Sequence, residues 1–437
     1  MKKNDIFEAE CIGYDSNGFG VVRFENMVFF VKGLLKNEIA ILKAIKILKN
    51  YGYAKIEKII EQSKERRTPN CEVFGICGGC DLMHLDYEEE LYIKREKIKN
   101  AMRKIAEIDI DEIKILPSPQ IQRYRNKVQI PVHFSNRIYA GFYRKKTNEI
   151  IEFSDCLMQT ELSNKIFESI SEKIKTETAK ELRHIIIRHA YFNNEAMVVF
   201  VIRRNVNIDY LIDSLVSKFP EIKSILLNFN DRKDNVILGE KEKLIFGRDY
   251  IIEKIGNLKF RISSKSFFQI NSFQTANLYN KAIENLNLSK DDVVIDLYCG
   301  TGSISLFAAK KVRKVFGVEI VKDAIFDAKE NMKLNDIENV EFINADASHG
   351  VKKLLERKIK ANALIVDPPR QGLDKSTIEA ILKLDPPKIA YISCNVATLA
   401  RDLKELNQNG YKLDYIEGVD MFPRTGHVET VVLMSRK

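Results

Sequence analysis

The stretch Val293-Val294-Ile295-Asp296-Leu297-Tyr298-Cys299-Gly300-Thr301-Gly302 decides the fold of the C-terminal part of the chain. Its first half is a run of apolar residues typical of a buried strand, and its second half is a glycine turn that opens a helix. A helical pattern precedes it at 274–286. Helical patterns of about 10 to 15 residues separate the earlier strands, and this alternation predicts a doubly wound, parallel α/β sheet. The further predicted strands are 314–318, 340–343, 363–366, 389–393 and 429–434.

The chain, at 437 residues, is too long for one hydrophobic core, and we expect three domains. Residues 1–62 show short alternating strands with turns such as Asn17-Gly18, the pattern of a small β-barrel resembling an OB fold. Residues 63–255 contain a cysteine cluster, a basic helix at about 86–107 and mixed strands and helices, and we expect an α+β central domain. Residues 256–437 form the predicted α/β domain.

The composition is that of a globular protein, with 45% hydrophobic and 30% charged residues. We find no run of about 18 apolar residues of the kind that spans a membrane. The first residues lack the apolar core of a signal peptide, and seven cysteines are an odd number for a disulfide framework. We therefore expect a cytoplasmic protein in a reducing compartment, with no membrane association and no obligate protein partner.

The net charge of +9 is concentrated in one window, residues 91–146. This window has 14 Lys and Arg against 5 Asp and Glu, so it carries an excess of +9 by itself. Lys94 and Arg125 are among its basic residues, and Tyr124 and Tyr143 are among the aromatic residues interleaved with them. Cations with aromatic rings suit a phosphate backbone and unstacked bases, although a basic run can also be a solvated surface. The pattern favours a nucleic-acid partner.

Carboxylates follow successive predicted strands after the glycine turn. Glu319 ends the second strand, at a spacing where an acid can accept hydrogen bonds from ribose hydroxyls, and Asp346 ends the third. Asp367 ends the fourth. The turn lacks the third glycine of the dinucleotide fingerprint. Together these features favour S-adenosylmethionine over NAD as the bound nucleotide.

Cys394 follows the strand Tyr391-Ile392-Ser393 and precedes a predicted helix. The N-terminus of a helix stabilises a thiolate, so we expect a lowered thiol pKa and a nucleophilic cysteine. Asp367 in Asp367-Pro368-Pro369-Arg370 and Glu429 after Gly426-His427-Val428 stand at other strand ends. If these side chains meet, they supply a nucleophile, a polar group and a base.

Five strings in this sequence together resemble the RNA uracil-5-methyltransferase family over almost the whole chain. They are Phe267-Phe268-Gln269-Ile270-Asn271, Asp296-Leu297-Tyr298-Cys299-Gly300-Thr301-Gly302, Asp367-Pro368-Pro369-Arg370-Gln371-Gly372, Ser393-Cys394-Asn395 and Gly426-His427-Val428-Glu429. The resemblance implies a Rossmann-like class I methyltransferase domain and a TRAM-like, RNA-binding barrel. It also implies S-adenosylmethionine-dependent methylation of carbon 5 of uridine.

The resemblance assigns roles to individual residues. Cys394 is the expected nucleophile and Glu429 the expected base. By this resemblance, the combination of the barrel and the cysteine cluster implies 23S rRNA as the substrate, and tRNA is the alternative substrate. The alternative from another class of function is a non-catalytic RNA-binding iron–sulfur protein. The identity of the uridine stays open. The expected cofactor-binding residues are Gln269, Tyr298, Gly300, Glu319, Asp346 and Asp367.

Four cysteines, Cys71, Cys77, Cys80 and Cys156, have a spacing that suits metal binding. The spacing alone leaves a zinc ion and an iron–sulfur cluster open. The family resemblance favours a [4Fe–4S] cluster with a structural role. Of the remaining cysteines, we expect Cys11 in the core of the barrel and Cys299 to pack beside the glycine turn.

Overall fold

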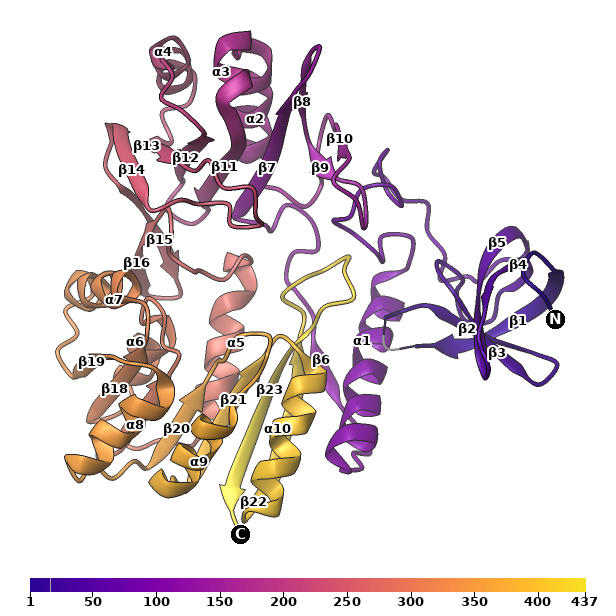
Figure 1. The fold of residues 1–437 in the computed structure, drawn as a ribbon. Helices are drawn as coiled ribbons and strands as arrows, with labels where there is room; N and C mark the ends of the chain where they lie inside the picture. The colour runs from indigo at the N-terminus through magenta and orange to yellow at the C-terminus, as the bar shows by residue number, and fades with distance from the viewer. Residues whose placement is uncertain (16) are drawn as a thin grey trace.

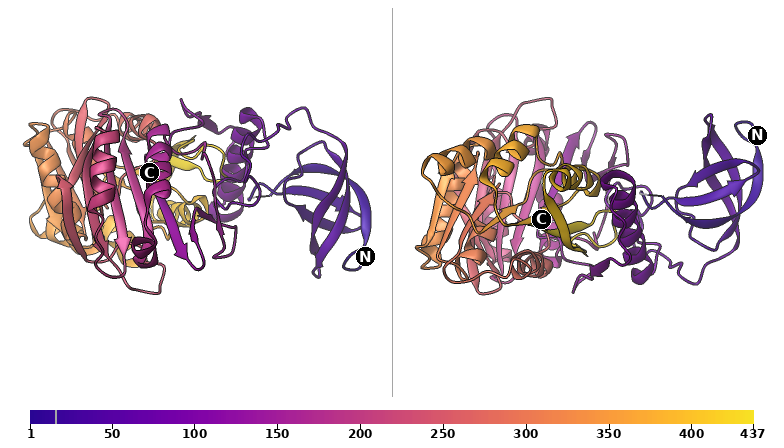
Figure 2. Two further views of the ribbon diagram at one scale, coloured as in Figure 1. Left: turned by 90° about the horizontal axis from the view of Figure 1, so that it is seen from above. Right: turned by 90° about the horizontal axis from the view of Figure 1, so that it is seen from below.

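The computed structural model describes residues 1–15 and 17–437. A small barrel lies at one end of the molecule and two larger α/β parts lie at the other, as Figures 1 and 2 show. The predicted fold class is therefore confirmed.

The N-terminal part is a closed five-stranded barrel with the strand order β1-β2-β3-β5-β4. Its inward-facing side chains alternate with outward-facing ones, and Phe7, Val22, Phe29 and Leu42 fill the interior. Cys11 is completely buried in this core, as expected. The strands are β1 (Ile6–Tyr14), β2 (Gly20–Phe24), β3 (Met27–Val31), β4 (Ile39–Ile47) and β5 (Tyr51–Glu61).

The central part is a six-stranded sheet with the order β14-β13-β12-β11-β7-β8. Strands β11 and β12 are almost wholly buried, with helices packed against them. The elements are β7 (Lys127–Phe134), β8 (Ile138–Ala140), β9 (Phe142–Tyr143), β10 (Ile150–Ile151), α2 (Glu161–Lys173), α3 (Thr176–Glu181), β11 (Leu182–Ala190), β12 (Glu195–Ile202), α4 (Asp209–Lys218), β13 (Ile222–Phe229) and β14 (Lys241–Gly247). A separate hairpin, β15 (Tyr250–Ile255) and β16 (Leu258–Ser263), follows them.

The C-terminal part is an eight-stranded sheet with the order β19-β18-β17-β20-β21-β23-β22-β6. The first five strands in this order are parallel, and β23 runs antiparallel between β21 and β22. The elements are α5 (Ser272–Glu284), β17 (Val293–Leu297), α6 (Ser303–Ala309), β18 (Lys314–Glu319), α7 (Lys322–Leu334), β19 (Val340–Asn344), α8 (Ala347–Glu356), β20 (Ala363–Val366), α9 (Lys375–Leu384), β21 (Lys388–Ser393), α10 (Val396–Gln408), β22 (Tyr411–Val419) and β23 (Glu429–Arg436).

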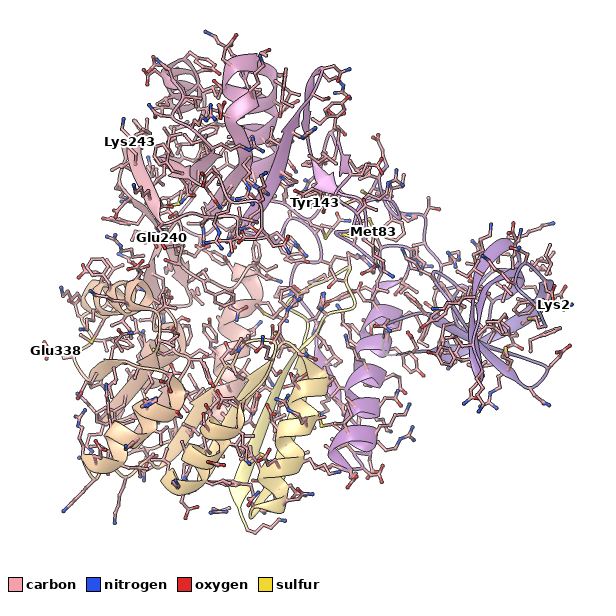
Figure 3. The ribbon with its side chains drawn as sticks, viewed as in Figure 1. Lys2, Met83, Tyr143, Glu240, Lys243 and Glu338 are labelled. Carbon is pink, nitrogen blue, oxygen red and sulfur yellow. The ribbon has the colours of Figure 1, made fainter. Side chains whose placement is uncertain are left out.

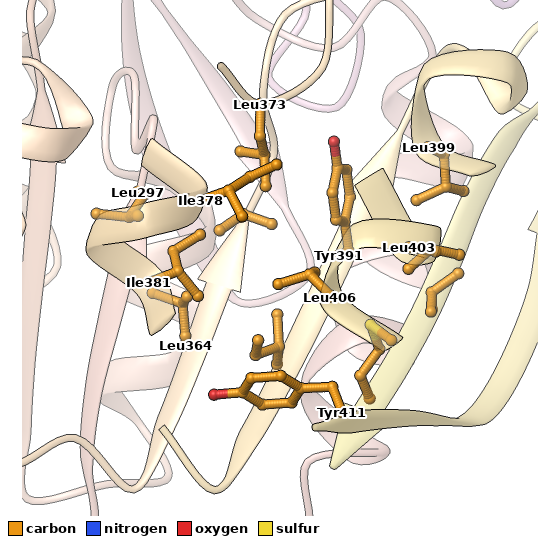
Figure 4. Close-up of a cluster of buried hydrophobic side chains, with 14 of the residues drawn as sticks. Leu297, Leu364, Leu373, Ile378, Ile381, Tyr391, Leu399, Leu403, Leu406 and Tyr411 are labelled. Atoms are coloured by element: carbon orange, nitrogen blue, oxygen red, sulfur yellow. The ribbon is translucent and has the colours of Figure 1, made fainter. Parts of the chain in front are cut away.

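Apolar side chains from α9, α10 and the strands pack against one face of this sheet, as Figure 4 shows for Leu297, Tyr391 and Leu403. Tyr391 is completely buried, and its hydroxyl donates a hydrogen bond to Oδ2 of buried Asp402 (2.7 Å). The same oxygen accepts the backbone N–H of Leu373 (2.8 Å). Together these two hydrogen bonds tie Asp402 on α10 to Tyr391 on β21 and to Leu373 in the segment that follows β20.

The expected boundary between the central and C-terminal domains differs from the structure. The predicted basic helix is α1 (Tyr87–Ala101), continued by a π-helical turn at Met102–Ala106, and it packs against α10. Strand β6 (Lys114–Leu116) pairs with β22 as the edge strand of the C-terminal sheet. The helix follows the predicted position, but apolar residues such as Ile98 and Met102 place it in the C-terminal core.

Gly350 on α8 provides a test of the packing between helix and sheet. A Cβ atom at this position would overlap Cγ1 of Val318 on β18 and lie 3.0 Å from its Cγ2. Alanine gains about 1 kcal/mol in helix propensity, whereas overpacking costs about 1–3 kcal/mol. Because the rigid valine cannot move aside, we expect Gly350→Ala to lower the melting temperature by a few degrees. Gly13→Ala, where a Cβ has open space, is the control, and an equal or higher melting temperature for Gly350→Ala would contradict the packing argument.

Candidate functional site

The polar residues predicted from the sequence gather along one edge of the C-terminal sheet. Strands β18, β17, β20 and β21 are parallel neighbours, so their carboxyl ends meet at this edge. Because β23 is antiparallel to β21, its first residue lies at the same edge. The side chains therefore follow one another across five adjacent strands, in the order Glu319, Tyr298, Asp367, Cys394 and Glu429.

Cys394 and Glu429 are brought together by strand register. Ser393 on β21 pairs with Thr430 on β23, and the next position in this antiparallel register sets Cys394 opposite Glu429. Residues directly opposite each other in an antiparallel pair have Cβ atoms about 5 Å apart and point to the same face. The thiol and the carboxyl group are thus neighbours, although they are separated by 35 positions in the sequence.

The Cys394 thiol does not have the lowered pKa that we expected. Burial, together with the nearby charges of Glu429 and Asp367, raises its pKa to about 11. The Arg370 guanidinium acts in the opposite direction. Helix α10 begins two residues after Cys394, and its first turn is already capped by Asn395, whose Oδ1 accepts the Ala397 N–H (3.1 Å). Desolvation and like charges therefore outweigh the helix terminus.

Two carboxyl groups in the site are protonated more readily than usual. Glu429 is only 3% exposed, and burial, with the charge of Asp367, raises its pKa well above the usual range. Its Oε2 atom has no hydrogen-bond partner in residues 1–15 and 17–437. Burial also raises the pKa of Asp367 to about 7. Asp367 can therefore exchange a proton near neutral pH, and Glu429 binds a proton more tightly than an ordinary carboxylate does.

The glycine turn leaves open space for a ligand. Tyr298, Gly300 and Gly302 all have positive φ, and a Cβ at Gly300 would meet no atom of the described chain within 4 Å. At Gly302 it would lie 2.8 Å from the Phe342 ring, so this glycine serves packing. Glu319 fixes the turn, because its Oε2 accepts the Gly300 N–H (3.1 Å) and its Oε1 accepts the Val321 N–H (2.8 Å).

The other predicted cofactor residues have different surroundings. Asp346 caps α8, where its Oδ1 accepts the His349 N–H (3.0 Å), an interaction that lowers its pKa. The Tyr298 hydroxyl lies 3.4 Å from Oγ1 of Thr377 on α9. Gln269 is buried just before α5, and its carbonyl accepts a hydrogen bond from Nδ2 of Asn126 (2.8 Å). Cys299 is buried beside the turn, as expected.

Two polar residues in this region were not singled out from the sequence. Asp296 is completely buried, its pKa is raised to about 7 by burial, and its Oδ1 lacks a partner within the described residues. The Tyr279 hydroxyl on α5 lies 2.9 Å from Oγ of Ser303. Burial raises the pKa of Tyr279, and Asp367, Asp296 and Glu429 add to this effect. Asp296 could have been found from the sequence, because it begins the quoted glycine motif. Tyr279 could not, because its spacing on the helix is the same as that of a core residue.

The four predicted metal ligands line one pocket of about 590 Å³ beside the central sheet. Met83 and Tyr143, which also line it, lie near each other in Figure 3. Burial raises the pKa of the Cys77 thiol, and Cys156 and Cys71 raise it further, while burial raises that of Cys80 to about 12. No group of three or more His, Cys, Asp or Glu side chains in the described part of the chain has the arrangement of a metal site.

Part of the basic window, residues 91–146, is buried or paired with acidic side chains. Lys94 is completely buried, and Tyr124 is buried with its hydroxyl bonded to the Pro423 carbonyl (2.9 Å). Arg123 pairs with Asp155 (2.6 Å), and Lys145 pairs with Asp81. Part of the positive charge is therefore used inside the protein. No described helix is long and apolar enough to cross a membrane.

Comparisons with known proteins identify the family. A family model described as tRNA (uracil-5-)-methyltransferase matches residues 86–437. Uncharacterized RNA methyltransferases of Clostridium tetani (strain Massachusetts / E88) and Oceanobacillus iheyensis are each 40% identical to this chain; the matches cover 100% of it, with 97% and 98% of the relatives. The crystal structure of the Pyrococcus abyssi tRNA (uracil-54, C5)-methyltransferase in complex with S-adenosyl-L-homocysteine has a TM-score of 0.78 and 27% identity. That similarity covers 98% of this chain and 99% of the other.

The reactivity of Cys394 tests the electrostatics of the site. Glu429 raises the thiol pKa and Arg370 lowers it. We therefore expect Glu429→Gln to shift the pH profile of Cys394 alkylation to lower pH and Arg370→Ala to shift it to higher pH. Mass spectrometry of the peptide that contains Cys394, after timed iodoacetamide treatment, gives the rate. Shifts in the same direction for both variants would refute the assignment of charges.

Proposed function

Because the chain belongs to the tRNA (uracil-5-)-methyltransferase family, we propose that it methylates carbon 5 of a uridine in RNA, with S-adenosylmethionine as methyl donor. The observation that carries this proposal is the placement of Cys394 opposite Glu429, at the sheet edge that also holds the glycine turn. A nucleophile, a base and an open nucleotide site on neighbouring strands are what this reaction requires.

S-adenosylmethionine supplies an electrophilic methyl group when bound. The open space at Gly300 and the strand-end carboxylate of Glu319 suit its nucleoside part. Asp346, at the next strand end, and Tyr298, in the turn, complete the proposed cofactor site. Gln269 and Asp367 are proposed to lie beside the cofactor, where the side chains of both can hydrogen-bond the uracil edge. Like the P. abyssi enzyme, which binds S-adenosyl-L-homocysteine, this chain is proposed to release that product.

Cys394 starts the proposed reaction, because carbon 5 of uracil is too weak a nucleophile to take the methyl group unaided. The Cys394 thiolate adds to carbon 6, forming a C–S bond, and the electron pair of the C5–C6 double bond becomes an enolate. Carbon 5 then displaces the methyl group from the sulfonium. Because burial raises the thiol pKa to about 11, the thiol has to lose its proton before it adds to carbon 6. Asp367, whose pKa of about 7 is raised by burial, is a suitable acceptor, and this leaves Glu429 unprotonated for the later step.

Glu429 completes the proposed cycle. After methyl transfer, carbon 5 carries both a methyl group and a proton. Glu429 removes this proton, the C5–C6 double bond re-forms, and the C–S bond breaks to release Cys394. Burial raises the pKa of Glu429, which makes it a stronger base than an ordinary carboxylate. A uracil inside a helix or stack cannot reach this edge, so the target nucleotide is expected to be flipped out or in a loop.

The barrel offers a surface for the rest of the RNA. Phe30 on β3 pairs with Tyr53 on β5, and their rings, with that of Tyr51, lie between 5.7 and 5.9 Å apart. Tyr51 is 38% exposed. Exposed aromatic rings of this kind bind unstacked bases without sequence preference. The barrel is therefore proposed to hold RNA next to the catalytic domain.

The first candidate substrate is 23S rRNA, because the barrel and the four cysteines together resemble the rRNA enzymes of the family. The second candidate is tRNA. It is favoured by the P. abyssi tRNA enzyme, whose similarity covers 98% of this chain, so the barrel by itself does not distinguish the two substrates.

Methylation with the purified full-length protein tests the function and the substrate together. We expect label from methyl-labelled S-adenosylmethionine to enter 23S rRNA as 5-methyluridine, and Cys394→Ala to abolish it. Label confined to tRNA would replace the first candidate with the second. RNA binding without methylation would support a non-catalytic RNA-binding protein, and full activity of Cys394→Ala would exclude the proposed mechanism.

The role of Glu429 predicts a distinctive defect. In Glu429→Gln, addition and methyl transfer can proceed, but the carbon-5 proton stays and the thiol cannot be eliminated. Turnover should fall about 100- to 10,000-fold, and a covalent protein–RNA adduct should persist on a denaturing gel. Loss of turnover without an adduct would assign Glu429 to an earlier step.

We further propose that Cys71, Cys77, Cys80 and Cys156 hold a [4Fe–4S] cluster, with zinc as the alternative. The four thiols line one pocket, and four thiolates are a suitable donor set for either group. The thiols do not have the arrangement of a metal site in the described structure, so they have to draw together around the metal. Since the methylation needs no electron transfer, a cluster here would have a structural role, joining the segment around Cys80 to the loop around Cys156.

Anaerobic reconstitution with iron and sulfide tests this site. We expect visible absorbance with about four irons per chain, lost in Cys156→Ser and kept in Cys11→Ala, whose thiol lies in the barrel core. Binding of one zinc per chain without iron would favour a zinc site over the cluster. Binding of neither metal would exclude both the cluster and the zinc site.

A further inference from the structure

A completely buried lysine joins α1 to the segment between β22 and β23. Lys94 is 0% exposed, and its Nζ donates hydrogen bonds to Oε1 of Glu90 (2.6 Å) and Oδ1 of Asp420 (2.6 Å). A third, longer bond goes to the Phe422 carbonyl (3.3 Å). All three donors of the ammonium group therefore have acceptors.

The two carboxylates that hold Lys94 have further partners. Oδ2 of Asp420 accepts the Tyr87 hydroxyl (2.8 Å). Glu90 accepts the Arg424 backbone N–H at Oε1 (2.7 Å), and its Oε2 lies 3.4 Å from Arg424 Nη1. Two cations thus face two anions without an excess of charge. We call Glu90, Lys94, Asp420 and Arg424 the Lys94 ion cluster.

Stability alone does not account for this cluster. Removing four charged groups from water is costly, and apolar side chains of similar volume often stabilise a fold as well or better. What the cluster provides is geometry, because it fixes Asp420 and Arg424, two points of the segment 420–428. Other hydrogen bonds help to hold the same segment, among them those from Lys97 Nζ to the Gly426 carbonyl (2.7 Å) and from the Tyr124 hydroxyl to the Pro423 carbonyl (2.9 Å).

Glu429 follows this segment directly and begins β23. Its Oε2 atom has no hydrogen-bond partner among the residues that the structure describes. The place of the carboxyl group therefore depends on the backbone before and after it. Strand pairing fixes the backbone after Glu429, and the irregular segment 420–428, held by the cluster, fixes the backbone before it.

We propose that the Lys94 ion cluster positions Glu429 for removal of the carbon-5 proton, with Lys94 and Asp420 acting as positioning residues. This inference rests on the function proposed above. It assigns to Lys94 a role inside the protein, although the sequence grouped it with RNA-binding cations. It also makes α1, which precedes the central sheet, part of the arrangement that holds the base.

Asp420→Asn in the full-length protein tests the proposal, because it removes one charge and keeps the side-chain shape. We expect turnover to fall up to about 100-fold, the loss that a displacement of roughly 1 Å can cause. The covalent protein–RNA adduct should persist as in Glu429→Gln, with unchanged affinity for S-adenosylmethionine. Amide hydrogen exchange in 420–428 should become faster. Asp385→Asn is the matched control, since it removes an ion pair with Arg436 at the far end of β23 and should change none of these.

Each outcome bears on one proposal. Adduct formation and methylation by the wild-type protein are measured first, and their absence counts against the proposed function. With an active wild type, normal turnover and exchange in Asp420→Asn would overturn the role of the cluster, as would lost turnover without a persistent adduct. If Asp420→Asn does not fold, Lys97→Met decides: faster exchange around Gly426 with a persistent adduct supports positioning, and unchanged values overturn it.

Discussion

The antiparallel insertion of β23 between β21 and β22 is the constraint on which the site depends. In a purely parallel sheet, the first residue of a strand lies at the edge opposite to the carboxyl ends of its neighbours. Reversing β23 brings Glu429 to the edge where Cys394 and Asp367 already stand. The pairing of Ser393 with Thr430 then sets which residue faces the thiol, since a shift of one position would turn the carboxyl group to the other face. Chemistry at this edge thus follows from strand direction and register.

The same edge concentrates groups whose ionisation is disfavoured. Cys394, Asp367, Asp296 and Glu429 all have raised pKa values, with burial as the main cause. In the core of a stable protein such groups would be replaced or paired. Here Oδ1 of Asp296 and Oε2 of Glu429 have no partner within residues 1–15 and 17–437. A buried carboxyl oxygen without a partner at this sheet edge suits the proposed ligands, since a sulfonium ion and a uracil edge offer suitable charge or donors.

Much of this arrangement is present in the sequence. The apolar segment 293–297 and the glycine turn after it predicted β17 and the open site at its end, because short-range patterns determine strands and turns. The sequence also predicted Cys394 and Glu429 as partners, through motifs. Three features depended on contacts between distant residues and could not be predicted. The thiol pKa is governed by carboxylates on other strands, α1 and β6 join the C-terminal sheet, and Lys94 is buried because Asp420, 326 residues away, completes its coordination.

The edge position of β6 also bears on the order in which the protein can fold. During synthesis, α1 and β6 emerge long before β22, the strand with which β6 pairs. Until then the apolar side of α1, including Ile98, lacks the surface of α10 that covers it. The central sheet and the barrel have their own cores and can form early. Closure of the C-terminal sheet is therefore a late, long-range event, and Glu429 cannot reach its place beside Cys394 before β23 has paired with β21.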